Sequence, residues 1–198
     1  MVRSTAQLIR RKGVSGTGMR EIVLEADAPR GSLQHYFPGG KEELVSEALL
    51  WMGGVAERRV RRHLEHLDPS TPSALLSALA DDWRVDMTNE GFTGGCPLVA
   101  ATADTAATSD QLRQVLKQAF DGWQEQLMAA LVALGVPDER AEGLALTVIS
   151  ALEGAIILAR TRREVAPLDT VVAELGPVLD ASTTNGPLDA AAVTAAQP

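Results

Sequence analysis

Apolar side chains recur every third or fourth residue along most of this chain. Between residues 110 and 134, for example, Leu112, Leu116, Trp123 and Leu127 share this spacing. The spacing matches the 3.6-residue period of an α-helix that packs one face against a core. Alanine and leucine, which favour helices, are abundant, whereas the aromatic residues that favour strands make up 4% of the chain. The pattern therefore predicts an all-α protein.

Glycine and proline divide this pattern into about nine helices. Thr17 is expected to cap the second helix through its side-chain oxygen, and Pro29 to lie in the first turn of the third helix. The last residues, 182–198, have no useful periodicity and are expected to form a disordered tail. The helices are expected at residues 2–12, 19–26, 29–37, 41–67, 73–89, 98–107, 110–134, 139–163 and 167–180.

The first three helices are expected to form a head that contains a helix-turn-helix motif. An apolar stripe that includes Ile22, Leu33 and Phe37 runs along two helices joined by a tight turn. The later helices carry enough apolar residues to bury a second core. We therefore expect three parts: a helix-turn-helix head at residues 1–45, a helical body at 46–181 and the tail at 182–198.

The charge of the chain is unevenly distributed. Its formal net charge is -8, but residues 1–62 hold 11 Lys and Arg against 7 Asp and Glu. Residues 63–198 hold 7 Lys and Arg against 19 Asp and Glu. A basic head on an acidic body indicates an anionic partner for the head alone, although ordinary variation in surface charge can give the same counts.

Cysteine usage and hydropathy indicate a cytoplasmic protein. The chain has one cysteine, Cys96, and so no internal disulfide, which fits a reducing compartment. It does not begin with a basic stretch followed by an apolar run, so no signal peptide is expected. The longest apolar segment, 144–159, is interrupted by Glu153 and is expected to be too short and too polar to span a membrane.

The third predicted helix presents hydrogen-bonding groups away from the apolar stripe. They include Arg30, Gly31, Ser32, Gln34 and His35. In the major groove of DNA, Arg forms a forked bond with guanine and Gln with adenine. Gly31 permits close approach of the backbone to a phosphate or base. The pattern favours a DNA-reading helix.

Three other interpretations of the segment around the third predicted helix are weaker. A nucleotide-binding loop needs G-x-G-x-x-G after a strand or a Gly-Lys-Ser/Thr ending, and "PGGKEEL" has neither. Ser32 and His35 have the residue types of a catalytic pair, but no orienting acid or oxyanion site is evident in the sequence. A polar helical hairpin without a ligand is the third interpretation.

The segment "GVSGTGMREIVLEADAPRGSLQHYFPGGKEELVSEAL" (13–49) resembles the DNA-binding head of TetR-family transcriptional regulators. The double glycine in "YFPGGKEEL" and the later "GCPLVAATAD" (95–104) are similar to the LmrA/YxaF-like branch. The resemblance implies an all-α homodimer that reads a palindromic operator with its third helix and is not an enzyme. It also implies a body that binds a small effector, of the apolar and aromatic kind in this branch.

The resemblance also assigns roles to residues of the head. Three positions depart from the family pattern: Gln34 stands where tyrosine is common, Val23 replaces a small alanine, and Asp27 replaces a turn glycine. Asp tolerates the left-handed conformation better than most residues. The residues expected to approach bases are Arg20, Arg30, Gly31, Gln34 and His35, and those expected to hold phosphates are Thr17, Ser32, Tyr36 and Lys41.

The predicted helix at 139–163 is apolar nearly all round, so it must be buried on both sides. One side is expected to face a pocket or core and the other a partner subunit, together with the last helix. Burial of the whole helix inside one chain is the alternative. The residues expected at the dimer interface are Leu144, Val148, Leu152, Ile156, Val171 and Leu175.

Aromatic and sulfur-containing residues with a few polar groups predict an effector pocket in the body, although plain core packing explains most of them as well. Glu153 is the exception, because an acid on an apolar helix needs either a ligand group or an internal Arg as partner. The pocket residues are expected to be Trp83, Met87, Phe92, Cys96, Phe120, Trp123, Met128, Ile149 and Glu153.

Neither a metal nor a cofactor is expected. His63 and His66 have no evident third ligand, and Cys96 has no conspicuous base nearby in the sequence. The arginines at positions 58, 59, 61 and 62 are expected either to be solvated or to pair with the acidic body. The sequence as a whole predicts a ligand-responsive repressor, and the alternative is a small-molecule carrier or enzyme-like protein with a vestigial head.

Overall fold

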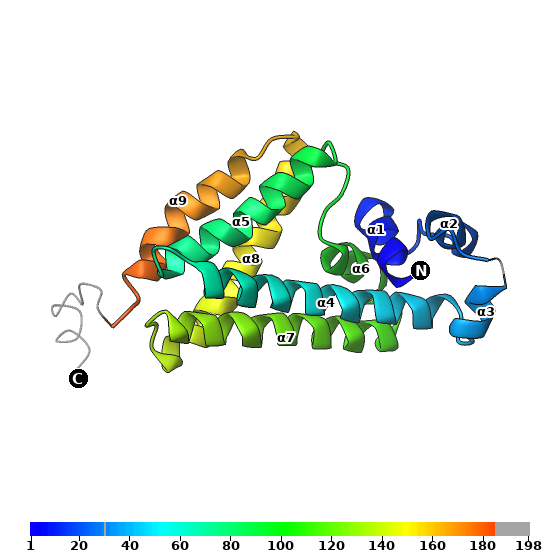
Figure 1. Cartoon of the computed structure of the whole chain (residues 1–198), viewed down its shortest axis with the longest axis horizontal. Coiled ribbons are helices and arrows are strands. Elements are labelled where there is room, and N and C mark those ends of the chain that lie inside the picture. Colours follow the sequence, from blue (N-terminus) through cyan, green and yellow to red (C-terminus); the bar gives the residue numbers. More distant parts are fainter. Residues whose placement is uncertain (30, 185–198) are drawn as a thin grey trace.

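The structure, a computed structural model, describes residues 1–29 and 31–184, and over these residues it contains helices and no strand (Figure 1). The all-α prediction is confirmed over this part of the chain. Most helix bounds lie within two residues of those predicted. The helices are α1 (Val2–Lys12), α2 (Met19–Glu25), α3 (Ser32–Tyr36), α4 (Lys41–His66), α5 (Pro72–Asn89), α6 (Pro97–Thr105), α7 (Asp110–Ala133), α8 (Asp138–Arg162) and α9 (Ala166–Asp180).

Two predictions about the ends of helices were wrong. The N-cap of α2 is Gly18, and no side chain caps this helix. Thr17 is instead fully buried, and its hydroxyl donates to the Gly13 carbonyl at 2.7 Å. The third helix has only five residues and begins at Ser32, whose N–H donates to the Pro29 carbonyl at 3.0 Å. Pro29 therefore precedes this helix rather than lying in its first turn.

The long helices α4 and α7 lie side by side along the long axis of the molecule (Figure 1). They approach closely at Gly53, where an added Cβ would lie only 2.9 Å from the Cβ of Ala119. Glycine at this position allows the two backbones to touch. Since α4 begins beside α3 and continues into the body, one rigid helix joins the two ends of the molecule.

The remaining body helices cover α4 and α7. α8 packs against α7 and α9, and α5 packs against α9. Their facing side chains form one large apolar core that includes Leu76, Leu127 and Leu152, all almost fully buried. A second, smaller core lies in the head and contains Leu8, Ile22, Phe37 and Leu44. The predicted boundary between head and body at residue 45 lies within α4 and stays a prediction.

The start of the predicted tail is packed against the body. Ser182 is buried, and the Thr184 N–H donates to the Gly135 carbonyl at 3.0 Å. The tail was predicted to begin at residue 182, so its first three residues differ from that expectation. Residues 185–198 lie outside the described part of the chain.

Among the described residues, α8 is long and apolar enough to qualify as a membrane span by length and composition alone. Half of its apolar window is buried inside the chain. The expectation that residues 144–159 are too short and too polar to span a membrane was therefore wrong by length and composition, and α8 packs against α7 and α9.

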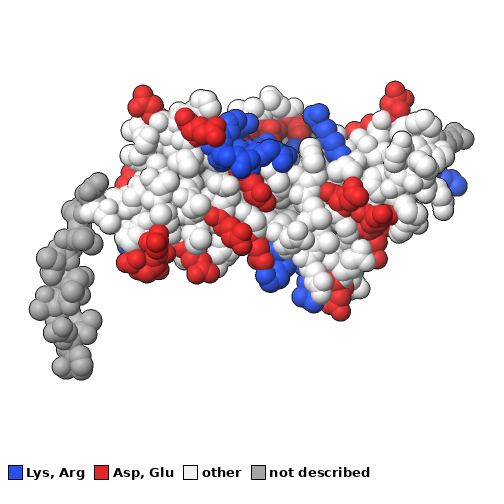
Figure 2. Space-filling view, turned by 60° about the horizontal axis from the view of Figure 1, so that its bottom comes forward, with Lys and Arg blue, Asp and Glu red and all other residues white. Residues whose placement is uncertain are grey.

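Several basic residues of the head are used in internal ion pairs. Lys12 pairs with Glu21, and Arg11 lies 3.7 Å from Glu25, so α1 and α2 are joined by charge as well as by their core. On the face shown in Figure 2, Lys and Arg gather mainly over the middle of the molecule, with Asp and Glu scattered around them. The excess of basic residues in the sequence thus overstates the free positive charge of the head.

Candidate nucleic-acid interface and body cavity

The head holds α2 and α3 on one small core and leaves their outer sides in solvent. Asp27, in the turn that follows α2, has φ 46°, the left-handed conformation that favours glycine. The expectation that Asp at this position adopts the conformation of a turn glycine is therefore met. Val23, which stands where the family commonly has a small alanine, is buried and lines the hollow between α2 and α3.

The exposed side of α3 carries most of the predicted reading residues. Gly31, Gln34, His35 and Tyr36 are all exposed, and an added Cβ at Gly31 would meet nothing within 4 Å. The His35 and Tyr36 rings lie edge to face with their centroids 4.9 Å apart. These groups have no core contacts to satisfy them, so they are free to meet a partner. Arg30, predicted to read a base, lies outside the described residues.

Gln34 shares an open hollow with Arg20 between α2 and α3. The hollow has a volume of about 730 Å³, and its walls include Met19 and Leu24. Leu24 is 76% exposed, the largest exposure among the large apolar side chains described. Arg20 and Gln34, 14 residues apart in sequence, are thus brought to one surface that combines hydrogen-bonding and apolar groups.

Three of the residues predicted to hold phosphates use their polar groups inside the chain. The Thr17 hydroxyl donates to Gly13, as described above. The Lys41 ammonium donates to the Val14 carbonyl at 2.7 Å and so fixes the start of α4 to the loop after α1. The Ser32 hydroxyl donates to the Pro29 carbonyl at 2.6 Å. Tyr36, by contrast, is 64% exposed.

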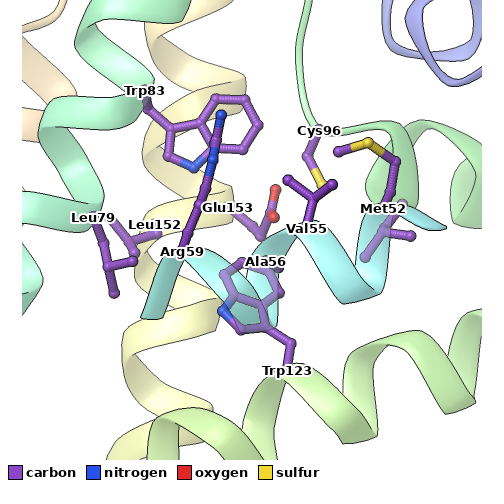
Figure 3. A pocket seen from close by; sticks show the side chains of 11 residues that line it. Met52, Val55, Ala56, Arg59, Leu79, Trp83, Cys96, Trp123, Leu152 and Glu153 are labelled. Carbon is purple, nitrogen blue, oxygen red and sulfur yellow. The ribbon is translucent and has the colours of Figure 1, made fainter. Parts of the chain in front are cut away.

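A small cavity lies between α4, α5, α7, α8 and the start of α6 in the body (Figure 3). Its volume is about 30 Å³, which is room for one or two water molecules but not for a drug-sized ligand. Four predicted pocket residues line it: Trp83, Cys96, Trp123 and Glu153. The prediction missed the other lining residues, which are Met52, Val55, Ala56, Arg59, Leu79, Leu98 and Leu152.

The other predicted pocket residues do not line this cavity. Met87 is fully buried in the core, and Ile149 is nearly so. Phe92 and Met128 are partly buried and pack against the same core. Phe120 stacks on Trp123, with ring centroids 6.4 Å apart, and so supports one wall from behind.

Glu153 projects from α8 toward the cavity and has no polar partner (Figure 3). Glu153 is only 7% exposed, and neither of its carboxylate oxygens accepts a hydrogen bond. Burial raises the pKa of Glu153 from 4.5 to about 7, and the nearby Cys96 thiol opposes part of this rise. The internal Arg partner that the sequence left open is therefore not present among the described residues.

Two further groups in the cavity wall have unusual surroundings. The indole N–H of Trp123 is buried without a hydrogen-bond partner. Burial and the neighbouring Glu153 carboxylate raise the pKa of the Cys96 thiol well above 9.0, so this thiol is protonated and a poor nucleophile. The cavity thus has an unpaired donor and an unpaired carboxyl group on apolar walls.

A second hollow reaches Cys96 and Glu153 from the outside. This open groove, of about 390 Å³, lies between α6 and α8, and its walls also include Val99, Ile157 and Arg160. Cys96 and Glu153 line both the small cavity and the groove, so they lie between the two.

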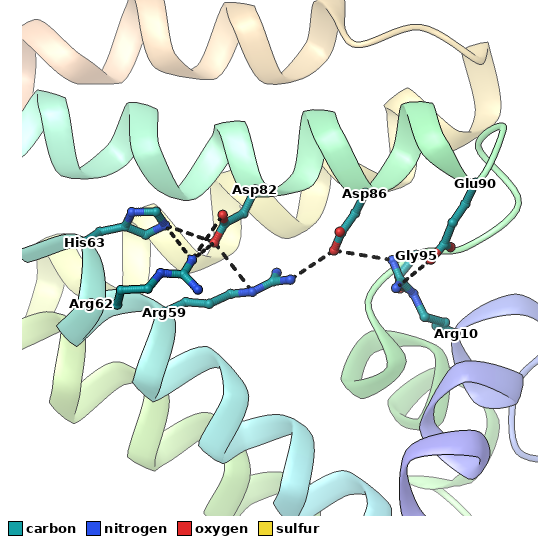
Figure 4. A network of polar contacts seen from close by, with 8 residues as sticks. All are labelled: Arg10, Arg59, Arg62, His63, Asp82, Asp86, Glu90 and Gly95. Carbon is teal, nitrogen blue, oxygen red and sulfur yellow. Dashed lines mark hydrogen bonds and ion pairs between the residues drawn. The ribbon is translucent and has the colours of Figure 1, made fainter. Parts of the chain in front are cut away.

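An ionic network that the sequence did not reveal links the head to the body (Figure 4). Arg10 of α1 lies 3.9 Å from Asp86 on α5 and 3.0 Å from Glu90, the residue that follows α5. Arg59 of α4 lies 3.0 Å from the same Asp86. The Arg10 side chain also donates to the Gly95 carbonyl at 3.2 Å.

Arg59 continues the network along α4 and α5. Its second partner is Asp82, at 3.5 Å, and Asp82 also pairs with Arg62 and His63. Of the two alternatives for the arginines of α4, pairing with the body is thus confirmed for Arg59 and Arg62. The spacing of Asp82, Asp86 and Glu90, four residues apart along one face of α5 and its C-cap, is the signal that could have revealed it.

Trp83 connects this network to the cavity. The guanidinium carbons of Arg10 and Arg59 lie 5.8 and 5.7 Å from its ring centroid, within the range of cation–π attraction. Since Trp83 and Arg59 also line the cavity, the cavity wall is in direct contact with a residue of the head.

The predicted dimer residues on α8 lie inside the chain. Leu144, Val148, Leu152 and Ile156 are all buried by the chain's own helices, and they step by four residues along the face toward α7 and α9. They cannot at the same time contact a partner subunit. The prediction chose the most apolar face, which is the one the chain itself buries first.

A different face of α8 and α9 is apolar and exposed. Its large members are Leu146, Ile157 and Leu158 on α8 and Val178 on α9, which are 48 to 53% exposed. Gly143 and Gly154 on the same helix have open space where a side chain would be. On α9, the predicted Val171 and Leu175 are only partly exposed and pack against the core.

No group of three or more His, Cys, Asp and Glu that could hold a metal ion occurs among the described residues. His63, one of the two histidines considered from the sequence, pairs with Asp82 at 3.0 Å.

Two family models match this chain. The model for bacterial regulatory proteins of the tetR family matches residues 2–48, and the model for the C-terminal domain of LmrA/YxaF-like transcriptional regulators matches residues 72–174. Both kinds of protein are transcriptional regulators rather than enzymes. The second match covers the groove, the acidic face of α5 and the cavity walls other than α4.

Relatives that match over most of their length are transcriptional regulators as well. An uncharacterized HTH-type transcriptional regulator of Mycobacterium tuberculosis H37Rv, Rv0196, is 36% identical over 184 residues, which cover 90% of this chain and 92% of the relative. The regulator YxaF of Bacillus subtilis is 31% identical over 179 residues, with the same coverage of both chains. The regulator LmrA of the same bacterium is 28% identical over 165 residues, covering 83% of this chain and 87% of LmrA.

The fold also matches that of a solved regulator structure. The regulatory protein TetR from Rhodobacter sphaeroides superposes with a TM-score of 0.77 at 23% identity, over 88% of this chain and 94% of that protein. Together, the two model matches and the full-length relatives show that this chain belongs to the TetR family of bacterial transcriptional regulators, with a C-terminal domain of the LmrA/YxaF-like type.

Proposed function

We propose that this regulator is a cytoplasmic repressor that binds a palindromic operator as a homodimer and leaves the DNA when a small effector enters its body. The observation that carries the proposal is the separation of two surfaces on one chain. Gln34 and His35 are exposed on α3 of the head, whereas unpaired polar groups line an apolar cavity in the body. DNA binding and effector binding therefore use different residues.

In this proposal, α3 of each subunit enters a major groove, and two successive grooves carry the two halves of the palindrome. Gln34 and Arg20 line one hollow beside α3, so both are candidates for contacts with bases. Arg30 keeps the base-reading role that the family resemblance implies. Tyr36 is the most exposed candidate for a phosphate contact.

The effector acts on the head through α4. Lys41, the first residue of α4, is bonded to the Val14 carbonyl in the head, while Met52, Ala56 and Arg59 of the same helix line the cavity. Because the cavity holds about 30 Å³, any part of the effector that enters it must push its walls apart, and α4 forms one of these walls. Linkage then requires that DNA weakens effector binding by the same factor by which the effector weakens DNA binding.

The homodimer is expected to form through the exposed apolar face of α8 and α9. A twofold axis beside two helices per subunit gives a four-helix bundle, which buries such a face on both subunits. In this arrangement Leu146, Leu158 and Val178 take the place of the interface residues that were predicted from the sequence.

The experiment that tests the proposed function is a genome-wide selection of DNA fragments, followed by gel shifts of the best fragment at several salt concentrations. We expect a palindrome whose affinity falls steeply with salt, because phosphate contacts release counterions. Absence of any preferred palindrome would reject the repressor and favour a carrier with a vestigial head.

Gln34→Ala is the matched variant for the reading helix. We expect it to weaken binding by about 1–3 kcal/mol and to relax the preference at one base of each half-site. Gln118→Ala, at an exposed position of α7, is the control and leaves binding unchanged. An equal loss for all sequences would show that Gln34 contacts only the DNA backbone.

A further inference from the structure

Glu153 lacks a positive partner on every side that the structure describes. The groups that line the two hollows beside it include two cations, Arg59 of α4 and Arg160 of α8. Arg59 is paired with Asp82 and Asp86, and Arg160 donates to the Arg11 carbonyl at 2.8 Å. Cys96 is the remaining titratable neighbour, and its thiol is protonated.

The unpaired carboxyl group is also accessible to a ligand. The groove between α6 and α8 has a volume of about 390 Å³, which falls within the range of sites for small molecules. Its walls are mainly apolar, with Val99, Ile156 and Ile157 among them, and Glu153 forms part of its floor. On the other side of Glu153, the rings of Trp83 and Trp123 line the small cavity.

A buried carboxylate without a partner is unfavourable, and one bonded to a cation is much less so. A neutral hydroxyl on a ligand would supply a hydrogen bond but no charge, whereas a protonated amine supplies both. Aromatic rings nearby attract cations as well. The site therefore lacks one positive charge and has an apolar volume for the rest of a molecule.

We propose that the effector is a lipophilic organic cation whose protonated amine pairs with Glu153 and whose apolar body occupies the α6–α8 groove. This inference rests on the proposed function, and it adds the chemical class of the effector. Binding of such a cation favours the ionised form of Glu153, so the complex forms with release of a proton wherever the free protein holds one.

Three molecules with one apolar body test the proposal by titration calorimetry on the full-length protein. They are 4-phenylbutylamine, 4-phenylbutanol and 4-phenylbutyrate, which are a cation, a neutral donor and an anion. At about pH 8 we expect the amine to bind about tenfold or more tighter than the alcohol, and the anion to bind weakest. At about pH 6 the preference for the amine decreases, and the binding enthalpy depends on the buffer because Glu153 releases a proton.

Glu153→Gln removes the charge and retains the shape. We expect this variant to lose the preference for the amine while its affinity for the alcohol stays within about threefold of that of the wild type. Glu142→Gln removes one charge at an exposed position of the same helix, so it controls for general attraction of cations to an acidic protein, and it should keep the preference. Should Glu153→Gln fail to fold, Glu153→Met carries the same expectation.

The proposal is overturned if the alcohol or the anion binds as tightly as the amine, or if the two glutamate variants lose the preference equally. Absence of amine binding at millimolar concentration also overturns it. These results are independent of the operator selection: a protein that prefers the amine but selects no palindrome contradicts the repressor and leaves the ligand class intact. A protein that binds its operator but prefers the alcohol contradicts the ligand class and leaves the repressor intact.

Discussion

Single residues inside this protein carry unpaired groups, and Glu153 has the largest consequence for stability. Between pH 4.5 and about 7, the folded protein holds a proton on Glu153 that the unfolded chain has released. The stability contributed by this proton is fully present below the ordinary pKa and is lost as the pH rises through the folded-state pKa. The ionised acid therefore destabilises the fold above neutral pH.

Glu153→Gln is expected to raise the free energy of unfolding at about pH 8 by roughly 2–4 kcal/mol and to have little effect near pH 4. Urea unfolding of the ligand-free wild type and the variant across this pH range measures the difference. Glu142→Gln, which is exposed, should follow the wild type. A difference between wild type and Glu153→Gln that does not change with pH would contradict the assignment.

Thr17 provides the second test at this scale, because its buried hydroxyl donates to the Gly13 carbonyl. Thr17→Val keeps the shape and is expected to lower the free energy of unfolding by about 1–2 kcal/mol, since the carbonyl loses its buried donor. Thr102→Val is the control, because the Thr102 hydroxyl makes the same type of bond at an exposed position of α6. Unchanged stability together with a shallower salt dependence of DNA binding would support a phosphate contact instead.

At the scale of elements, the helices were predictable because their apolar period is local, and the contacts between helices were not. Each bound of α4 and α7 lies within a residue of its prediction. The link between Arg10 and Glu90, by contrast, joins residues 80 positions apart. Periodicity shows that Arg10 lies on α1, but it does not show which helix the Arg10 side of α1 contacts. α3 is shorter than predicted because Pro29 accepts a bond from Ser32 in the preceding turn.

Arg10→Ala is expected to lower the free energy of unfolding by about 1–3 kcal/mol, because it leaves Glu90 without its partner and removes the contact with Trp83. Hydrogen exchange should also become faster in α1 than in α7, since α1 loses its attachment to α5. Arg113→Ala breaks an exposed pair with Asp110 and should cost no more than about 1 kcal/mol. Equal effects of the two variants would show that the network adds no stability.

At the scale of the whole molecule, the sequence predicted a two-core helical regulator but not which side of α8 is exposed. Leu144 and Val148 are more regular in spacing than Leu146 and Ile157, so the sequence favoured the face that the chain buries itself. The exposed face mixes large apolar residues with glycine, serine and threonine, and no periodicity distinguishes it. The same limit applies to the groove, whose walls come from α6 and α8.

Leu146→Glu is expected to give a folded monomer with much weaker operator binding, because a charge in the proposed four-helix bundle is costly to bury. Analytical ultracentrifugation measures the oligomeric state, and circular dichroism shows whether the helices persist. Val85→Glu, at a similarly exposed position of α5, is the control and should remain dimeric. A Leu146→Glu protein that stays dimeric would place the interface elsewhere.

The placement of the three tryptophans makes the protein its own optical reporter. Trp83 and Trp123 both line the cavity, whereas Trp51 is 38% exposed on α4 and lies outside it. Replacement of Trp51 by Phe therefore leaves emission from the cavity walls alone. Since Trp83 is also in contact with Arg10, the same emission responds both to a molecule that reaches Glu153 and to a head that separates from the body.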